Sequence, residues 1–104
     1  MSRIGAFEEL VLLAVLGLDG SGYGVSIREE LEAETGEAIS LGAVYATLDR
    51  LERKGLVRST VGPATAERGG RRKRVFRVSA AGTVALRAMQ RIRNQLGAPA
   101  PARA

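Results

Sequence analysis

The sequence predicts a mainly α-helical domain with one small β-hairpin, which is an α+β fold. Four stretches repeat apolar residues at steps of three and four, the spacing of one face of a helix. Two shorter runs alternate in the manner of strands and flank a glycine-containing basic segment. The length of 104 residues and the apolar content of 45% suit one domain with a single core, and the sequence contains no internal repeat.

The first predicted helix is apolar nearly all round. Phe7, Leu10 and Leu18 belong to one stripe, and further leucines and valines fill much of the remaining circumference. We therefore expect either that this helix crosses the middle of the core or that its second face meets another subunit, and the small domain favours the second. The apolar run is too short to span a bilayer, and the preceding Glu8 and Glu9 do not suit a signal peptide, so we expect a cytoplasmic protein.

The second predicted helix follows a turn of Asp, Gly and Ser residues at 19–22. Ser21 is a suitable N-cap, and Gly36 is a suitable C-terminal stop. The charged residues between them cover most of the helix surface. One apolar stripe remains for the core, made of Tyr23, Ile27 and Leu31.

The third predicted helix is capped by Ser40 and ends at Gly55. Its core stripe consists of Leu41, Val44, Leu48 and Leu51. The opposite side carries small, polar and basic residues, and a face of this kind can lie close to a groove. Its members are Ala43, Ala46, Thr47, Arg50, Arg53 and Lys54.

Residues 56–61 and 74–78 alternate as strands do and predict an antiparallel hairpin with a long basic tip at 62–73. Ser79 is placed to cap a last helix. The apolar stripe of that helix consists of Leu86, Met89, Ile92 and Leu96. Residues 1–97 therefore form the predicted domain, and the Ala/Pro-rich residues 98–104 are expected to be a disordered tail.

The charge of the chain is unevenly distributed. Residues 68–104 carry ten Arg or Lys and no Asp or Glu, whereas residues 1–67 carry six basic and eleven acidic residues, so the two parts contribute +10 and −5 to the net charge of +5. This polarity predicts a basic surface for an acidic partner, with nucleic acid favoured over membrane. Without Cys and His, the chain lacks thiol nucleophiles, disulfides, imidazole bases and the commonest zinc ligands, so we predict neither an enzyme nor a cofactor.

Three helices, a hairpin and a final helix, in the order α-α-α-β-β-α, are the order of a winged helix-turn-helix. A helix about 10–12 Å across fits the major groove, and a basic hairpin can reach the neighbouring backbone. Two alternatives remain open: a winged-helix module that binds an acidic protein, and an RNA-binding protein suggested by Arg68-Gly69-Gly70. One such tripeptide is weak support for RNA binding.

Three blocks of the sequence resemble the PadR family of bacterial transcriptional regulators. They are 22–25 (GYGV), 40–57 (SLGAVYATLDRLERKGLV) and 72–82 (RKRVFRVSAAG), and the likeness extends over roughly residues 6–96. The resemblance implies a homodimeric repressor of transcription that binds double-stranded DNA through its third helix and its wing. It also implies dimerisation through the last helix with help from the first. Small-molecule inducers are common in the family. Four residues differ from those usual in the family but keep their size or capping ability. They are Ala46, Phe76, Val78 and Ser79.

Two sets of residues are the resulting candidates for DNA binding. On the third helix, Ser40 can approach a phosphate as well as cap, and Tyr45 either meets a phosphate or packs its ring against the core. Arg50 either contacts DNA or pairs with a neighbouring acid such as Asp49. The complete set is Ser40, Ala43, Tyr45, Ala46, Thr47 and Arg50, with Arg71, Arg72, Lys73 and Arg74 of the wing as phosphate contacts.

A third set of candidates concerns assembly. Tyr23 and Phe76 are expected in the core, and Phe7 either in the core or between subunits. The predicted dimer contacts are Phe7, Leu10, Leu86, Met89, Ile92 and Leu96.

Overall fold

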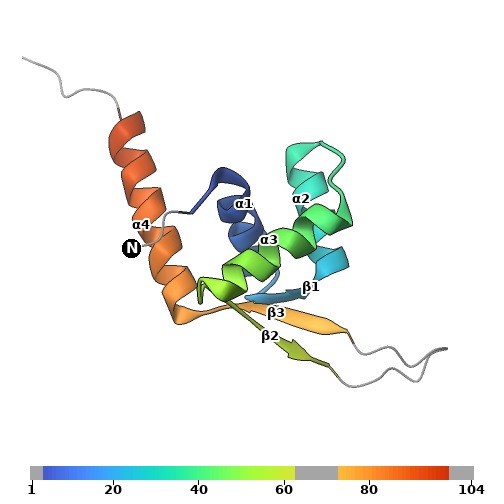
Figure 1. The fold of residues 1–104 in the computed structure, drawn as a ribbon. Coiled ribbons are helices and arrows are strands. Elements are labelled where there is room, and N and C mark those ends of the chain that lie inside the picture. The colour runs from blue at the N-terminus through green and yellow to red at the C-terminus, as the bar shows by residue number, and fades with distance from the viewer. Residues whose placement is uncertain (1–3, 63–72, 99–104) are drawn as a thin grey trace, which may run out of the picture.

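The computed structural model describes residues 4–62 and 73–98. Within these residues the chain forms four helices and one three-stranded antiparallel sheet (Figure 1). The elements in chain order are α1 (Ala6–Gly17), β1 (Ser21–Tyr23), α2 (Gly24–Thr35), α3 (Leu41–Arg53), β2 (Val57–Val61), β3 (Arg74–Val78) and α4 (Ala80–Gly97).

The core lies between the first three helices and one face of the sheet. In Figure 1, α3 passes in front of α1 and α2, and the sheet lies below them. Phe76 of the central strand β3 is fully buried, as predicted, and joins apolar residues of every helix. The fully buried side chains around it include Val11, Leu12, Ile27, Leu48 and Leu51.

Strand β1 was not predicted. Residues 21–23 pair with β3 in the register Ser21↔Arg77 and Tyr23↔Val75, so Ser21 is a strand residue and its predicted role as a helix cap is wrong. The N-cap of α2 is Tyr23, which makes no side-chain capping bond. Asp19 and Gly20 have positive φ angles of 61° and 85° and turn the chain toward β3. Three residues without alternating hydrophobicity carry no strand signal.

The other predicted helix ends are confirmed. The Ser40 hydroxyl accepts a hydrogen bond from the Ala43 amide at 3.0 Å, and the Ser79 hydroxyl accepts one from the Gly82 amide at 3.0 Å. Gly36 and Gly55 follow α2 and α3 with φ angles of 71° and 77°. Glycine is favoured there because other residues are strained in this left-handed region.

Helix α1 has one buried and one exposed side. Val11, Leu12 and Val15 are completely buried, whereas Leu10 and Leu16 are 42% and 43% exposed. Of the two expectations for this helix, a course through the middle of the core is therefore wrong. Within the described residues, no helix is long and apolar enough to cross a membrane.

Helix α4 leaves the core after its first two turns. Gly82 and Leu86 are its buried residues, and positions 90–98 are all exposed. The far half of α4 projects beyond the other helices in Figure 1. One ion pair links it back to α1, because the Arg93 guanidinium donates to the buried Glu9 carboxylate at 2.6 and 3.0 Å.

Candidate nucleic-acid interface

Helix α3 presents a continuous exposed stripe. Its members recur at helical spacing and change from small to basic along the helix. A Cβ atom added to Gly42 would meet no described atom within 4 Å, so the fold itself does not require a glycine there. Small side chains and one bare backbone position allow a partner to approach closely. The stripe consists of Gly42, Ala43, Ala46, Arg50 and Arg53.

The predicted position of Thr47 on this exposed stripe is wrong. Thr47 is 1% exposed. It lies three residues after Val44 and four before Leu51, both of which are completely buried, and therefore faces the core with them. Its hydroxyl has a different role, since it accepts a hydrogen bond from Arg50 Nη2 at 3.1 Å.

Arg50 pairs across the molecule rather than with a neighbour on its own helix. The alternative of an ion pair with Asp49 is not what the structure shows. Arg50 Nε lies 3.8 Å from Glu8 Oε2 of α1, while the Arg50 side chain remains 50% exposed. The guanidinium is thus held between Thr47 and Glu8 and still reaches the exposed stripe.

Glu8 is a buried carboxylate that joins α1 to the C-terminal end of α3. Its Oε1 accepts hydrogen bonds from the Gly5 amide at 2.7 Å and from Lys54 Nζ at 2.8 Å. Burial acts to raise the pKa of Glu8. The hydrogen bonds from Lys54 and Gly5, with the charges of Lys54 and Arg50, outweigh burial and lower the pKa below its ordinary value of 4.5.

The stabilisation from Glu8 should therefore disappear in acid. A carboxyl whose pKa is lowered by folding stabilises the fold above its unfolded pKa, and this contribution is lost as the pH falls through the folded pKa. At pH ~7 we expect Glu8→Gln to lower the free energy of unfolding by about 2 kcal/mol. Urea denaturation at pH ~7 and pH ~3 measures this difference. If the wild type exceeds Glu8→Gln in stability by the same amount at pH ~3 as at pH ~7, the ionised Glu8 carboxylate does not stabilise the fold.

Tyr45 packs its ring, which supports the second of its two expected roles. The ring lies 6.1 Å from that of Phe76, measured between centroids. It also covers the start of α2 so closely that a Cβ added to Gly24 would lie 2.5 Å from Tyr45 Cζ. A larger residue than glycine at position 24 would therefore displace the end of the Tyr45 side chain. A phosphate contact by the Tyr45 hydroxyl stays a prediction.

Arg74 joins the base of the wing to α3. Its Nη2 donates to Glu52 Oε1 at 2.9 Å and to the Ser59 hydroxyl at 3.1 Å, and its Nη1 lies 3.4 Å from Asp49 Oδ1. The guanidinium also lies 4.8 Å above the Phe76 ring. Glu52 further accepts from the Ser59 amide at 3.1 Å. Arg74 is thus occupied within the chain, which weakens its candidacy as a phosphate contact.

The remaining wing candidates are only partly described. Lys73 Nζ lies 5.4 Å above the ring of Tyr23. Tyr23 is 43% exposed, so its predicted place in the core is wrong. As a residue of β1 it lies opposite Val75, on the sheet face away from Phe76. Arg71 and Arg72 lie outside the described residues.

The outer face of the sheet carries two arginines that sequence reasoning missed. Arg58 of β2 and Arg77 of β3 are direct cross-strand partners, and both are exposed. Within the described residues neither makes an ion pair. Like charges in this position repel each other. The alternation of each predicted strand places its arginine on the outward face. The pairing of Arg58 with Arg77 depends on the register between β2 and β3, which the sequence did not define.

The predicted dimer residues divide into two groups. Leu86 is 2% exposed and belongs to the core of its own chain, so its predicted place in a subunit contact is wrong. Phe7 and Met89 are partly buried against the same core. Three residues remain free for a contact between chains, with exposures of 42% for Leu10, 49% for Ile92 and 83% for Leu96.

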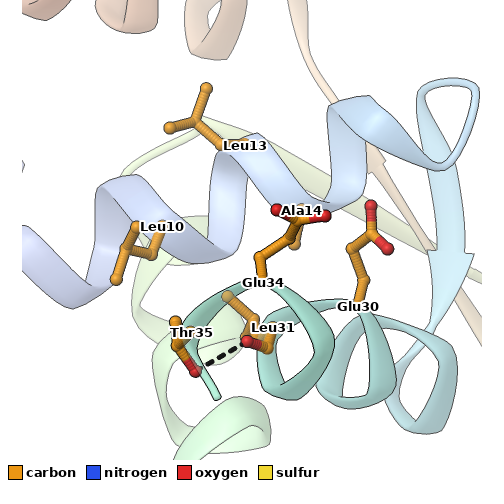
Figure 2. A pocket seen from close by; sticks show the side chains of 7 residues that line it. All are labelled: Leu10, Leu13, Ala14, Glu30, Leu31, Glu34 and Thr35. Atoms are coloured by element: carbon orange, nitrogen blue, oxygen red, sulfur yellow. Dashed lines mark hydrogen bonds between the residues drawn. The ribbon is translucent and has the colours of Figure 1, made fainter. Parts of the chain in front are cut away.

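A shallow pocket of about 210 Å³ lies between α1 and α2. Leu10, Leu13 and Ala14 come from α1, and two glutamates, Glu30 and Glu34, stand one turn apart on α2 (Figure 2). Leu31 and Thr35 complete its lining. Within the described residues neither glutamate makes an ion pair. The pocket therefore combines an apolar wall with two carboxylates.

The arrangement of helices, sheet and wing is that of winged-helix DNA-binding proteins. One solved example, from STIV, is 13% identical to this chain, with a TM-score of 0.74 over 93% of this chain and 97% of its own. At this identity the likeness shows the fold alone. It confirms the predicted winged helix-turn-helix, to which the structure adds strand β1.

The family is shown by the sequence match. Residues 12–88 match the transcriptional regulator PadR-like family, and the chain belongs to that family. RosR of H. salinarum is 26% identical, with a TM-score of 0.68 over 93% of this chain and 81% of its own. A PadR family transcriptional regulator of Eggerthella lenta is 25% identical, with a TM-score of 0.67 over 85% and 74%. No curated protein sequence matches this chain.

The family membership decides the general function. The chain is a DNA-binding transcriptional regulator, and the prediction that it is not an enzyme is confirmed, because the family consists of regulators.

Proposed function

We propose that the protein is a dimeric repressor that inserts α3 into the major groove of its operator. The observation that carries this proposal is the exposed stripe of α3, where Gly42, Ala43 and Ala46 leave room for a close approach. Arg50 and Arg53 follow on the same side and supply donors for guanine or phosphate. Sequence selection by base edges therefore belongs mainly to α3.

The wing supplies contacts to the flanking backbone in this proposal. Arg71, Arg72 and Lys73 carry three positive charges in succession. Such charges give affinity and salt dependence without reading bases. Ser40 and the Tyr45 hydroxyl stay candidates for phosphate contacts, because Ser40 caps α3 and Tyr45 lies near the start of this helix.

A negative charge on the α3 stripe should weaken DNA binding. Ala46 is exposed, so Ala46→Glu should leave the fold intact while it places a carboxylate against DNA phosphates or base edges. We expect a loss of about tenfold or more in affinity for the duplex upstream of the protein's own gene, measured by gel shift. Ala33→Glu, at an exposed position of α2, makes the same change elsewhere and should bind like the wild type. Equal binding to upstream and scrambled duplexes by the wild type would refute the specific-repressor proposal.

The proposed dimer uses the exposed apolar residues of α4 and α1. Ile92 and Leu96 project from the half of α4 that leaves the core, and Leu10 lies on the open side of α1. A two-fold dimer would place two α3 helices in half-sites about one helical turn apart, ~34 Å.

Aspartate in this surface should separate the subunits. We expect Ile92→Asp with Leu96→Asp to give a folded monomer in sedimentation experiments, because burying two carboxylates without partners is costly. Val84→Asp provides the control, since Val84 is 67% exposed on the same helix and lies outside the predicted contact. An intact dimer of the double variant would move the contact elsewhere.

The outer face of the sheet supports the alternative function, binding of an acidic protein. Arg58 and Arg77 form an exposed basic pair without a described counter-ion. The gel shift separates the two functions, because a module for an acidic protein has no reason to prefer the upstream duplex over a scrambled one.

In this proposal, the pocket between α1 and α2 is the candidate site for a small-molecule inducer. The pocket adjoins Leu10, which belongs to the proposed dimer contact. Apolar walls with Glu30 and Glu34 suit a small lipophilic cation.

A further inference from the structure

Glu8 faces the DNA-reading helix with one satisfied and one unsatisfied oxygen. Oε1 receives the Gly5 amide and Lys54 Nζ, whereas Oε2 is buried and accepts no hydrogen bond from the described residues. The cation beside Oε2 is Arg50, whose Nε lies 3.8 Å away. A buried carboxylate oxygen without a donor is costly, and a nearby positive charge reduces that cost.

Arg50 is held in this position from both sides. Nη2 donates to the Thr47 hydroxyl at 3.1 Å, and Thr47 is fixed because it is 1% exposed. The side chain of Arg50 is nevertheless 50% exposed on the α3 stripe. The same guanidinium is therefore available to two anions, the carboxylate of Glu8 and a DNA phosphate.

We propose that Glu8 is an internal competitor of DNA for Arg50 and thereby a specificity-determining residue. This inference rests on the proposed use of α3 in DNA binding. When Arg50 turns to a lone phosphate, it exchanges one anion for another and leaves the buried Glu8 carboxylate with Lys54 alone, so the net gain is small. When it meets a guanine, it gains two hydrogen bonds to O6 and N7, which outweigh the loss. Glu8 thus reduces binding to DNA of any sequence more than binding to the operator.

The adjacent Glu9 offers a matched comparison. Glu9 is 4% exposed and Glu8 6%, and each holds an arginine. Glu9 holds Arg93 of α4, at 2.6 Å, whereas Glu8 holds Arg50 of α3. Glu8→Gln and Glu9→Gln therefore change the net charge equally and each loosen one arginine, but only Arg50 lies on the stripe. Glu8→Gln also weakens the contact with Lys54, and the Arg50→Gln background separates that effect from the effect on Arg50.

The experiment measures binding to scrambled duplex by fluorescence anisotropy at several salt concentrations, with circular dichroism as a check of folding. For Glu8→Gln we expect tighter binding at about 50 mM salt and a log-log salt slope steeper by about 0.9 for each phosphate contact that Arg50 adds. This slope corresponds to an additional loss of about 3.5-fold per contact between about 50 and about 200 mM salt. The preference for upstream over scrambled duplex falls accordingly. Glu9→Gln should keep the wild-type slope.

Two results would overturn the inference. One is an equal slope for Glu8→Gln and Glu9→Gln. The other is a Glu8→Gln effect that persists in the Arg50→Gln background, since Glu8 acts through Arg50. Lack of preference for the upstream duplex by the wild type would refute the proposed repressor instead, and the slopes on scrambled DNA would still decide the role of Glu8.

A second measurement does not require Glu8→Gln to fold. Arg53 lies one turn from Arg50 on the same stripe, is exposed and makes no ion pair with a described residue. On scrambled duplex, Arg53→Gln should lower the slope by about 0.9 per subunit, and Arg50→Gln by much less. Equal losses would show that Glu8 does not restrain Arg50.

Discussion

Replacing Gly82 with alanine should lower the free energy of unfolding by about 3 kcal/mol, because the added methyl group has no space. Its Cβ would overlap the backbone carbonyl oxygen of Leu56 and lie 2.8 Å from Val78 Cγ1. The carbonyl is not free to move, since it accepts the Ser79 amide at 3.0 Å just before α4 begins. The clash therefore acts on the attachment of α4 to the sheet.

Chemical denaturation measures this loss, and Gly97→Ala provides the control. Gly97 is the last residue of the same helix, and a Cβ there would meet no described atom within 4 Å. Gly97→Ala should therefore have the stability of the wild type or slightly more. If Gly82→Ala is as stable as Gly97→Ala, the start of α4 does not pack against Leu56 as described.

Binding to the upstream duplex should weaken by about a thousandfold or more between about 50 and about 200 mM salt. Arg53, Arg71, Arg72 and Lys73 supply four basic side chains per subunit and thus eight per proposed dimer. A protein that neutralises six to ten phosphates, in round numbers about eight, releases enough counterions to give a loss of this size. Gel shifts or anisotropy across this range measure the slope.

The wing's share of this slope can be measured separately. Arg71→Gln with Arg72→Gln should lower the log-log slope by about 1.8 per subunit, because two phosphate contacts are lost. Arg87→Gln with Arg91→Gln removes the same charge from exposed positions of α4 and should leave the slope unchanged. Equal slopes for both double variants would mean that net charge, and not wing contact, determines the salt dependence.

The order of the elements was predictable because it depends on local patterns. Ser40, Ser79, Gly36 and Gly55 mark helix ends by side-chain chemistry that operates within a few residues. Phe76 was correctly placed in the core by the alternation of its strand. Strand β1 escaped prediction because its stability comes from pairing with β3, more than fifty residues later in the chain.

The interface was less predictable, since its details depend on contacts between distant residues. Thr47 could have been assigned correctly, because its spacing from Val44 and Leu51 places it on the buried side. Glu8 gave no such signal, as its partner Lys54 is 46 residues away. Leu86 and Ile92 share one apolar stripe, and the sequence does not show that the core of the chain ends between them.

The contacts of Arg74 have a consequence for the form of the operator. Arg74, Glu52 and Ser59 fasten strands β2 and β3 to α3, so this helix and the described part of the hairpin form one rigid piece. In the proposed complex, the number of base pairs between the bases that α3 reads and the phosphates beside strands β2 and β3 is then fixed within each half-site. In the proposed dimer, the distance between half-sites depends instead on the projecting α4. Natural operators should therefore vary in the spacer between half-sites and keep a constant length within each half-site.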